Sequence, residues 1–257
     1  MQMVVFGVLG LCAVSTAEAA DVQVETGDGV ALAATALGQG EKGVLLVHGQ
    51  GRTRADWSNF GQKLSNNGFH VLAVDLRGHG ASGGELDEAA WPLMVNDVKA
   101  STAWLRGHGA NHVTIIGAEV GANLAFAAAS GNDQISSVIM LSPGLNINGV
   151  KVSAAISAYG DRPLLLIADA TDATSSRAAG LIADKVTGKK KLELVEGAGS
   201  GVKMINTEAS IEGLVVGWMN DAYGGSEDLK ATRREVSSGE VSDDITTSGT
   251  RFGEKSE

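Results

Sequence analysis

Residues 113–123 read VTIIGAEVGAN and join two apolar stretches through the segment Gly117-Ala118-Glu119-Val120-Gly121. The run at 113–116 is predicted to be a strand. The stretch from about 120 to 129 is predicted to be a helix. A charged residue, Glu119, therefore stands between two glycines at a strand-to-helix junction, and this junction defines one βα unit of the fold.

Strands and helices alternate on both sides of this junction. Residues 22–25 and 30–34 predict an antiparallel hairpin around the turn Gly27-Asp28-Gly29. Further strands are predicted at 44–47, 69–74, 137–141, 164–168 and 192–195, and helices at 55–66, 91–105, 175–186 and 207–219. The alternation indicates an α/β fold with a mostly parallel sheet, covered on both faces and opened by the hairpin. The interval between 141 and 164 leaves no room for a large cap domain.

Composition and charge narrow the classes of protein and partner. The chain has 257 residues, 44% of them hydrophobic, which is enough for one domain with a sizeable core and additional termini. Its formal net charge of −10 disfavours nucleic acid and anionic membranes as partners, because both would repel it. The acidity has a simpler interpretation as well, since net charge alone favours solubility.

The first twenty residues are apolar, lack Lys and Arg, and end in the small-x-small pattern Ala17-Glu18-Ala19. This pattern predicts a signal peptide and export to a periplasm or to the outside of the cell. The rival interpretations are a membrane anchor and a core helix, but the apolar run at about 4–14 is short for a span. The only cysteine, Cys12, follows Leu11, which does not favour lipidation, and the mature chain would have neither disulfides nor thiolate ligands.

The composition changes again near the C-terminus. From about 225 to 257, Ser, Thr, Glu, Asp and Gly dominate and apolar residues stand alone, which predicts a disordered acidic tail. The alternative is a tail that binds a partner. The predicted organisation is therefore a signal peptide at 1–20, an α/β domain at 21–224 and a tail at 225–257.

Two further motifs follow predicted strands, namely HGQG at 48–51 and DLRGHGAS at 75–82. With the Gly117–Gly121 junction and the strand order, they give the chain a resemblance to small, capless α/β hydrolases of the dienelactone hydrolase kind, from about 22 to 220. The resemblance implies a three-layer α/β-hydrolase fold and a Ser-His-Asp triad that cleaves esters. It also implies a strained elbow, Gly-x-Ser-x-Gly, that exposes the nucleophilic serine and leaves no space for side chains at the two glycines.

Two triad positions are substituted. Glu119 occupies the nucleophile position of an otherwise intact elbow formed by Gly117 and Gly121. The resemblance places the triad acid at Asp172, with Asp169 as a weaker candidate, although an Asp at this point also suits the start of a helix. It places the histidine within GAGSG at 197–201, where Ser200 stands instead.

The missing histidine is evident without any alignment. The five histidines are at positions 48, 70, 79, 108 and 112, so none follows the last predicted strand. His48 and His79 belong to the two loop motifs and are interpreted as structural. Ser82 lies in GASGG at 80–84, which matches the elbow pattern, but no helix is predicted to begin there, so it is not expected to be a nucleophile.

The resemblance also places an oxyanion hole at the backbone N–H groups of Gln50 and Val120, beside the start of the elbow helix. One hypothesis is that the Glu119 carboxylate folds back into this hole. Another is that it pairs with a neighbouring cation, Arg52 or Arg54.

The sequence therefore predicts an exported, catalytically inactive α/β-hydrolase relative that binds a small molecule or a protein. The alternative is an esterase or acyl hydrolase of the serine-hydrolase type with an atypical site. A structural role in the cell envelope is a third interpretation. No cofactor is expected, and no metal is expected because the histidines and carboxylates lack the close pairing of a zinc site. No membrane span is expected after removal of the signal peptide.

Overall fold

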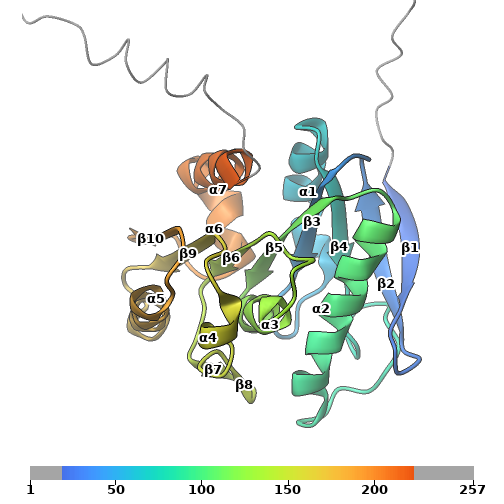
Figure 1. Cartoon of the computed structure of the whole chain (residues 1–257), viewed down its shortest axis with the longest axis horizontal. Coiled ribbons are helices and arrows are strands. Elements are labelled where there is room, and N and C mark those ends of the chain that lie inside the picture. The colour runs from blue at the N-terminus through green and yellow to red at the C-terminus, as the bar shows by residue number, and fades with distance from the viewer. Residues whose placement is uncertain (1–18, 223–257) are drawn as a thin grey trace, which may run out of the picture. The chain divides into compact units, whose positions relative to one another are not determined.

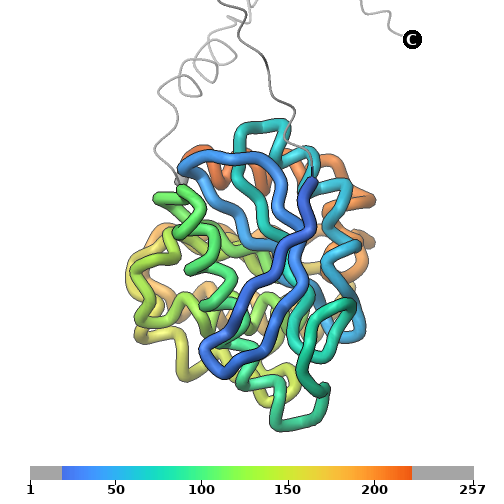
Figure 2. The backbone as a smooth tube through the Cα atoms, turned by 90° about the vertical axis from the view of Figure 1, so that its right-hand side faces the viewer, coloured from blue at the N-terminus to red at the C-terminus, as the bar shows by residue number. Residues whose placement is uncertain are grey.

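A computed structural model describes residues 19–222, so the predicted tail and nearly all of the predicted signal peptide lie outside the described residues. Eight strands form one sheet in the order β1-β2-β4-β3-β5-β6-β9-β10. In that order they are Ala20–Glu25, Ala31–Leu37, His70–Val74, Lys42–Val47, His112–Ala118, Ser137–Leu141, Leu164–Asp169 and Lys190–Val195. The β1–β2 and β2–β4 pairs are antiparallel, and all other pairs are parallel. The predicted mostly parallel sheet with an N-terminal hairpin is confirmed, and Figure 2 shows the hairpin at one edge of it.

Helices cover both faces of the sheet (Figure 1). One face carries α2 (Ala90–Gly107), α3 (Val120–Ala129), α4 (Ile156–Tyr159) and α5 (Ala173–Lys185). The other carries α1 (Ser58–Asn66), α6 (Val202–Thr207) and α7 (Ala209–Ala222). A hydrophobic core lies on each face of the sheet, and successive side chains of a strand point alternately to the two faces. Leu45 packs in the core beneath α2, α3, α4 and α5, and Leu46 packs in the core beneath α1, α6 and α7. Because both faces are covered, the central strands are continuously apolar.

The structure differs from the predicted elements in two places. The predicted helix at 207–219 corresponds to α7, and a further short helix that the sequence did not predict, α6, precedes it. Glu208, whose backbone is extended with φ −117° and ψ 99°, separates the two helices. Between β6 and β9 the chain forms a small hairpin, β7 (Asn146–Ile147) with β8 (Val150–Lys151), followed by α4. These elements are too short to give a periodic apolar pattern, so the sequence did not predict them. A 3-10 turn at Arg54–Trp57 precedes α1.

The carboxyl ends of the parallel strands bring the candidate residues together. Gly49 and Gln50 follow β3, Glu119 follows β5, Asp172 follows β9, and Ser200 follows β10. Loops at these ends form the usual binding crevice of open α/β sheets. The fold therefore places segments that are distant in the sequence around one end of the sheet.

Candidate functional site

The turn between β5 and α3 is a sharp elbow. Glu119 has φ 55° and ψ −117°, a conformation that side chains other than glycine rarely adopt. A Cβ on Gly117 would collide with the backbone of Gly121, and a Cβ on Gly121 would collide with the backbone of His48. Both glycines are therefore sterically required, as the resemblance implied, and Glu119 lies at the strained point of the turn.

The Glu119 carboxylate lies over the loop that follows β3. Its Oε1 accepts a hydrogen bond from the Ser200 hydroxyl, with 2.7 Å between the oxygens. Its Oε2 lies so close to the Cα of Gly49 that a Cβ there would overlap the carboxylate. The structure thus joins Glu119 and Ser200, the two residues predicted to replace triad members, although 81 positions separate them in the chain.

The loop that presents Ser200 is anchored on both sides. Asp169, which is buried at the end of β9, accepts hydrogen bonds from the N–H groups of Gly197 (3.2 Å) and Gly199 (2.7 Å). The hydroxyl of Ser142 accepts from the N–H of Gly201 at 3.0 Å. The position of the Ser200 side chain is therefore fixed by backbone contacts rather than by packing, since Ser200 itself is exposed.

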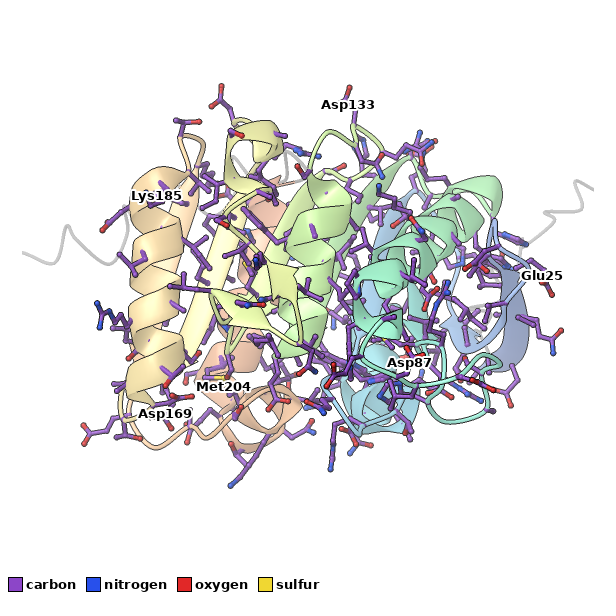
Figure 3. The ribbon with its side chains drawn as sticks, turned by 90° about the horizontal axis from the view of Figure 1, so that it is seen from below. Glu25, Asp87, Asp133, Asp169, Lys185 and Met204 are labelled. Carbon is purple, nitrogen blue, oxygen red and sulfur yellow. The ribbon has the colours of Figure 1, made fainter. Side chains whose placement is uncertain are left out.

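Asp169 has a defined electrostatic state. The Thr171 N–H and hydroxyl, followed by the N–H groups of Gly199 and Gly197, lower the pKa of its carboxyl to about 2. Figure 3 shows Asp169 at the same end of the molecule as Met204, whose sulfur receives a hydrogen bond from Ser142 at 3.3 Å. The sequence offered Asp169 only as a weaker acid candidate and did not single out Ser142, whose φ of 52° marks a second tight turn.

Asp172 caps a helix. It is the N-cap of α5, and its Oδ1 accepts from the N–H groups of Thr174 (3.0 Å) and Ser175 (3.1 Å). Asp172 also lines a cavity of about 840 Å³ together with Glu119 and Ser200. The helix-start interpretation of this residue is thus confirmed, and its role as a triad acid stays a prediction.

The predicted oxyanion-hole residues border the same cavity, but Glu119 does not bond to them. Gln50 and Val120 both line it, and the Gln50 side chain accepts from the Asn148 side chain at 3.0 Å. Among residues 19–222, the Glu119 carboxylate hydrogen-bonds to Ser200 and not to the N–H group of Gln50 or Val120. Within these residues the structure thus shows no hydrogen bond between the carboxylate and the predicted hole, and the hypothesis that Glu119 fills the hole stays a prediction.

The proposed cation partners of Glu119 are occupied elsewhere. Arg52 forms two hydrogen bonds to Asp56, at 2.5 and 2.8 Å. Arg54 pairs with Asp75 and, at 3.5 Å, with Asp21. Arg52 nevertheless lies close to the site, since it lines a cavity together with Glu119. The carboxylates of Asp56 and, to a smaller extent, Glu119 raise the pKa of its guanidinium. The predicted ion pair of Glu119 with Arg52 or Arg54 was wrong.

A second, smaller cavity also borders the Glu119–Ser200 pair. It measures about 430 Å³ and is lined by Arg52, Asp56, Lys203 and Asn206, with Gly49 at its base. Glu119 and Ser200 line both cavities. A ligand in either cavity would therefore meet a carboxylate and a hydroxyl, a pair that suits hydroxyl or amine groups.

The histidines are engaged away from these cavities. His48 is fully buried, its Nε2 accepts from the Leu76 N–H at 3.0 Å, and its Nδ1 lies 2.7 Å from the Gly49 carbonyl. These partners fix the neutral form with the proton on Nδ1, and burial lowers the pKa of the ring. His79 packs against His48 and Trp91 with its Nδ1 near the Arg77 carbonyl. Both are structural, as the sequence predicted.

Residues 19–222 contain neither a cluster suited to a metal ion nor a helix suited to cross a bilayer. No group of three or more His, Cys, Asp and Glu side chains within 19–222 is arranged to hold a metal ion. Over the same residues, no helix has the length and apolar character that a bilayer crossing requires.

A family model matches most of the sheet, and solved structures share the fold. The family model described as "Serine aminopeptidase, S33" matches residues 38–195, which include Glu119 and end just before the loop of Ser200. Among solved structures, an esterase of Pyrococcus furiosus is similar with a TM-score of 0.70 at 21% identity, covering 86% of this chain and 96% of that one. A dienelactone hydrolase of Anabaena variabilis has a TM-score of 0.66 at 18% identity, covering 79% of this chain and 97% of that one.

Curated relatives match shorter segments. Lipase LipV of Mycobacterium tuberculosis is 30% identical over 142 residues, which are 55% of this chain and 51% of the lipase. An acyl transferase of Shewanella hanedai is 30% identical over 84 residues, which are 32% of this chain and 27% of the transferase. The matched segments thus span between about a quarter and a half of the length of these relatives.

Proposed function

Because the chain belongs to the serine aminopeptidase family of α/β hydrolases, we propose that it is a member that no longer cleaves esters. In this proposal the elbow cavity serves as a binding site for a small polar ligand. The observation that supports it is the hydrogen bond between the Glu119 carboxylate and the Ser200 hydroxyl, at 2.7 Å. A carboxylate and a hydroxyl occupy the two positions where the family has a hydroxyl and an imidazole.

The chemistry of this pair argues against efficient hydrolysis. A serine hydroxyl becomes nucleophilic when a base near neutral pKa takes its proton, and histidine is the usual base. Carboxylates are generally weak bases at neutral pH, so the pair in this site lacks the proton acceptor of the family. An acyl group attached to Glu119 would also need an activated water for its release, and no histidine lines either cavity within the described residues.

The shape and polarity of the larger cavity support binding. Its volume of about 840 Å³ lies within the range of small-molecule sites. Glu119, Ser200, Asp172 and Arg177 supply polar groups, while Val120, Leu145 and Ile147 supply apolar ones. We expect a ligand with hydroxyl or amine donors that face Glu119 and an apolar part that faces Leu145.

A second candidate function follows from the same hydrogen bond. Ser200 lies within the distance at which a nucleophile contacts its base, so the two roles could be exchanged relative to the family. Ser200 Oγ would attack the acyl carbon, its proton would pass to Glu119 and then to the leaving alkoxide, and water would release the acyl group. This is the atypical serine-hydrolase alternative.

Activity measurements separate the two functions. We expect the full chain to show no turnover of short chromogenic esters above the buffer rate, and no labelling by a fluorophosphonate probe. Glu119→Ala and Ser200→Ala should then change nothing. Turnover that disappears in Glu119→Ala, or a fluorophosphonate adduct mapped to Ser200, would establish the second candidate and refute the first.

A restoration experiment tests why activity is absent. Glu119→Ser combined with Ser200→His restores the residue types of the family triad at the elbow and at the β10 loop. If substitution alone abolished hydrolysis, the double variant gains esterase activity while Glu119→Ser alone stays inactive. A double variant that folds but stays inactive would locate the cause in the wider pocket, beginning with Asp172, whose carboxylate caps α5.

Export is part of the proposal and rests on the leader-like sequence at 1–20. The first strand of the sheet begins at Ala20, next to the predicted cleavage site. Expression of the full gene followed by cell fractionation and N-terminal sequencing should recover a protein that starts at Ala20 or Asp21 outside the cytoplasm. Recovery of an intact N-terminus in the cytoplasm would contradict export.

A further inference from the structure

A second cleft lies apart from the Glu119–Ser200 pair, between the β7–β8 hairpin, α4 and α5. Its volume is about 640 Å³. Apolar side chains form much of its lining, namely Leu145, Val152, Ile156 and Leu181. It shares only Leu145 and Asn146 with the lining of the larger elbow cavity, so it is a distinct site.

The cleft concentrates apolar surface that water contacts. Among residues 19–222, five large hydrophobic side chains are exposed, and two of them, Leu145 (47%) and Leu181 (36%), line this cleft. Exposed leucines that gather in one concave site are more informative than leucines scattered singly over a surface. Their exposure leaves free energy to be gained by any apolar group that covers them.

The charges at the cleft are all of one sign. Lys151 and Lys185 line it, and no Asp or Glu does. This is unusual in a chain with 30 acidic and 20 basic residues. Within the described residues neither lysine forms an ion pair, whereas Lys63, Lys189 and Lys191 each pair with an acid. The cleft therefore offers two ammonium groups beside an apolar floor.

We propose that this cleft binds a single-chain amphiphile with an anionic head, namely a long-chain fatty carboxylate. The alkyl chain lies against Leu145, Ile156 and Leu181, and the carboxylate is held by the ammonium groups of Lys151 and Lys185. Apolar burial supplies the affinity, and the two charges select the head group. The proposal does not rest on what the elbow cavity binds, because Lys151, Lys185 and Leu181 line this cleft and not the elbow cavity.

The test is calorimetric titration of the full chain with monomeric dodecanoate, below its critical micelle concentration. We expect binding of one equivalent, and no comparable binding of dodecyltrimethylammonium, which has the same chain length and the opposite charge. Lys151→Gln with Lys185→Gln should weaken dodecanoate binding by about fivefold, because each exposed charge contact is modest. Leu181→Asp should weaken it by about tenfold or more, since it removes apolar area and adds a like charge.

Matched controls separate the cleft from nonspecific adsorption. Lys63→Gln with Lys99→Gln removes two lysines elsewhere, and Leu93→Asp alters an exposed leucine on α2, so neither should change the affinity. Thermal unfolding by circular dichroism checks that each variant is folded. Equal binding of the two head groups, or an equal loss in the cleft and control variants, would refute the proposal. Binding to phosphatidylglycerol vesicles without binding of monomeric dodecanoate would refute it as well.

Discussion

Two segments of the molecule carry the glycine spacing of a hydrolase elbow, GASGG at 80–84 and GAEVG at 117–121, and only the second is an elbow. In the first, the Ser82 hydroxyl donates to the Asp75 carbonyl at 2.6 Å and accepts from the Ala33 N–H at 2.8 Å. In the second, Glu119 sits at a strained turn and lines two cavities. The segment with a serine at its centre uses it to join β2 to the end of β4, and the segment with the elbow geometry has a glutamate at its centre.

The hydrogen-bond partners of the central residue decide whether a Gly-x-Ser-x-Gly-like segment can take part in chemistry. Ser82 already uses its proton and a lone pair within the loop after β4, so it is not available to attack a substrate. That loop is further fixed by Asp75, which accepts from the N–H groups of Arg54 (2.7 Å) and Ala81 (3.0 Å). The elbow instead holds its central side chain through one hydrogen bond to an exposed serine.

The largest expected effect on stability comes from adding a side chain at Gly117 of the elbow. Gly117→Ala should lower the free energy of unfolding by about 3 kcal/mol or more and the Tm by about 10 °C, because its Cβ would meet the backbone of Gly121. Gly180→Ala is the matched control, since it lies inside α5 with open space around it and should stabilise the protein by about 0.5–1 kcal/mol. Equal melting temperatures for the two variants would show that the elbow is not closely packed.

The next effect contrasts the two serines. Ser82→Ala removes both hydrogen bonds of a partly buried hydroxyl and should destabilise the protein by about 1–2 kcal/mol. Ser200→Ala removes one hydrogen bond of an exposed hydroxyl and should change stability by less than about 0.5 kcal/mol. Urea denaturation of both variants checks the difference. If Ser200→Ala were the more destabilising change, the β10 loop would depend on Ser200 rather than on Asp169 and Ser142.

A smaller expected difference in stability, between two variants of Glu119, measures the backbone strain at the elbow. Glu119→Ala and Glu119→Gly both remove the carboxylate, but only glycine adopts φ 55° without a Cβ penalty. Glu119→Gly should therefore be more stable than Glu119→Ala by about 1 kcal/mol in denaturation experiments. Equal stability of the two variants would mean that the turn relaxes once the glutamate is removed.

The smallest expected effect on stability is confined to acidic pH. Asp169 has a pKa of about 2 in the folded protein, below its ordinary value near 3.8, so the folded state binds its proton less readily than the unfolded state. The resulting stabilisation is fully present above about pH 4 and is lost as the pH falls towards 2. Denaturation of the wild type and of Asp169→Asn between pH 5 and pH 2, chosen as about the range of this titration, should show profiles that converge in acid. Parallel profiles would show that Asp169 titrates normally.

The sequence predicted the sheet, its hairpin and its layers because these depend on apolar periodicity and on strand order. It also located the elbow and the serine at the end of β10. It did not predict that Glu119 and Ser200 touch, because that contact depends on how two loops close over the sheet. The contact that Arg52 makes was visible in principle, since Asp56 lies four residues later and the pair competes with any longer-range partner.

The other contacts that the sequence did not predict depend on tertiary structure. Arg54 pairs with Asp75 across two strand ends, a contact that no local pattern encodes. Asp169 binds the loop after β10 through backbone N–H groups, and such bonds leave no signature in side-chain types. Asp172, in contrast, stands at the first position before α5, where a helix cap is expected from sequence alone.

Gly49 has a consequence for how this site can change. The Glu119 carboxylate occupies the volume that any side chain at position 49 would need, so the identities of these two residues are epistatic. A methyl group at position 49 would displace the carboxylate, whereas it would lie 3.5 Å from the Cβ at position 119, an ordinary van der Waals distance. Position 49 therefore constrains the rotamer of Glu119, and a side chain at 49 becomes compatible with this loop only after position 119 has changed.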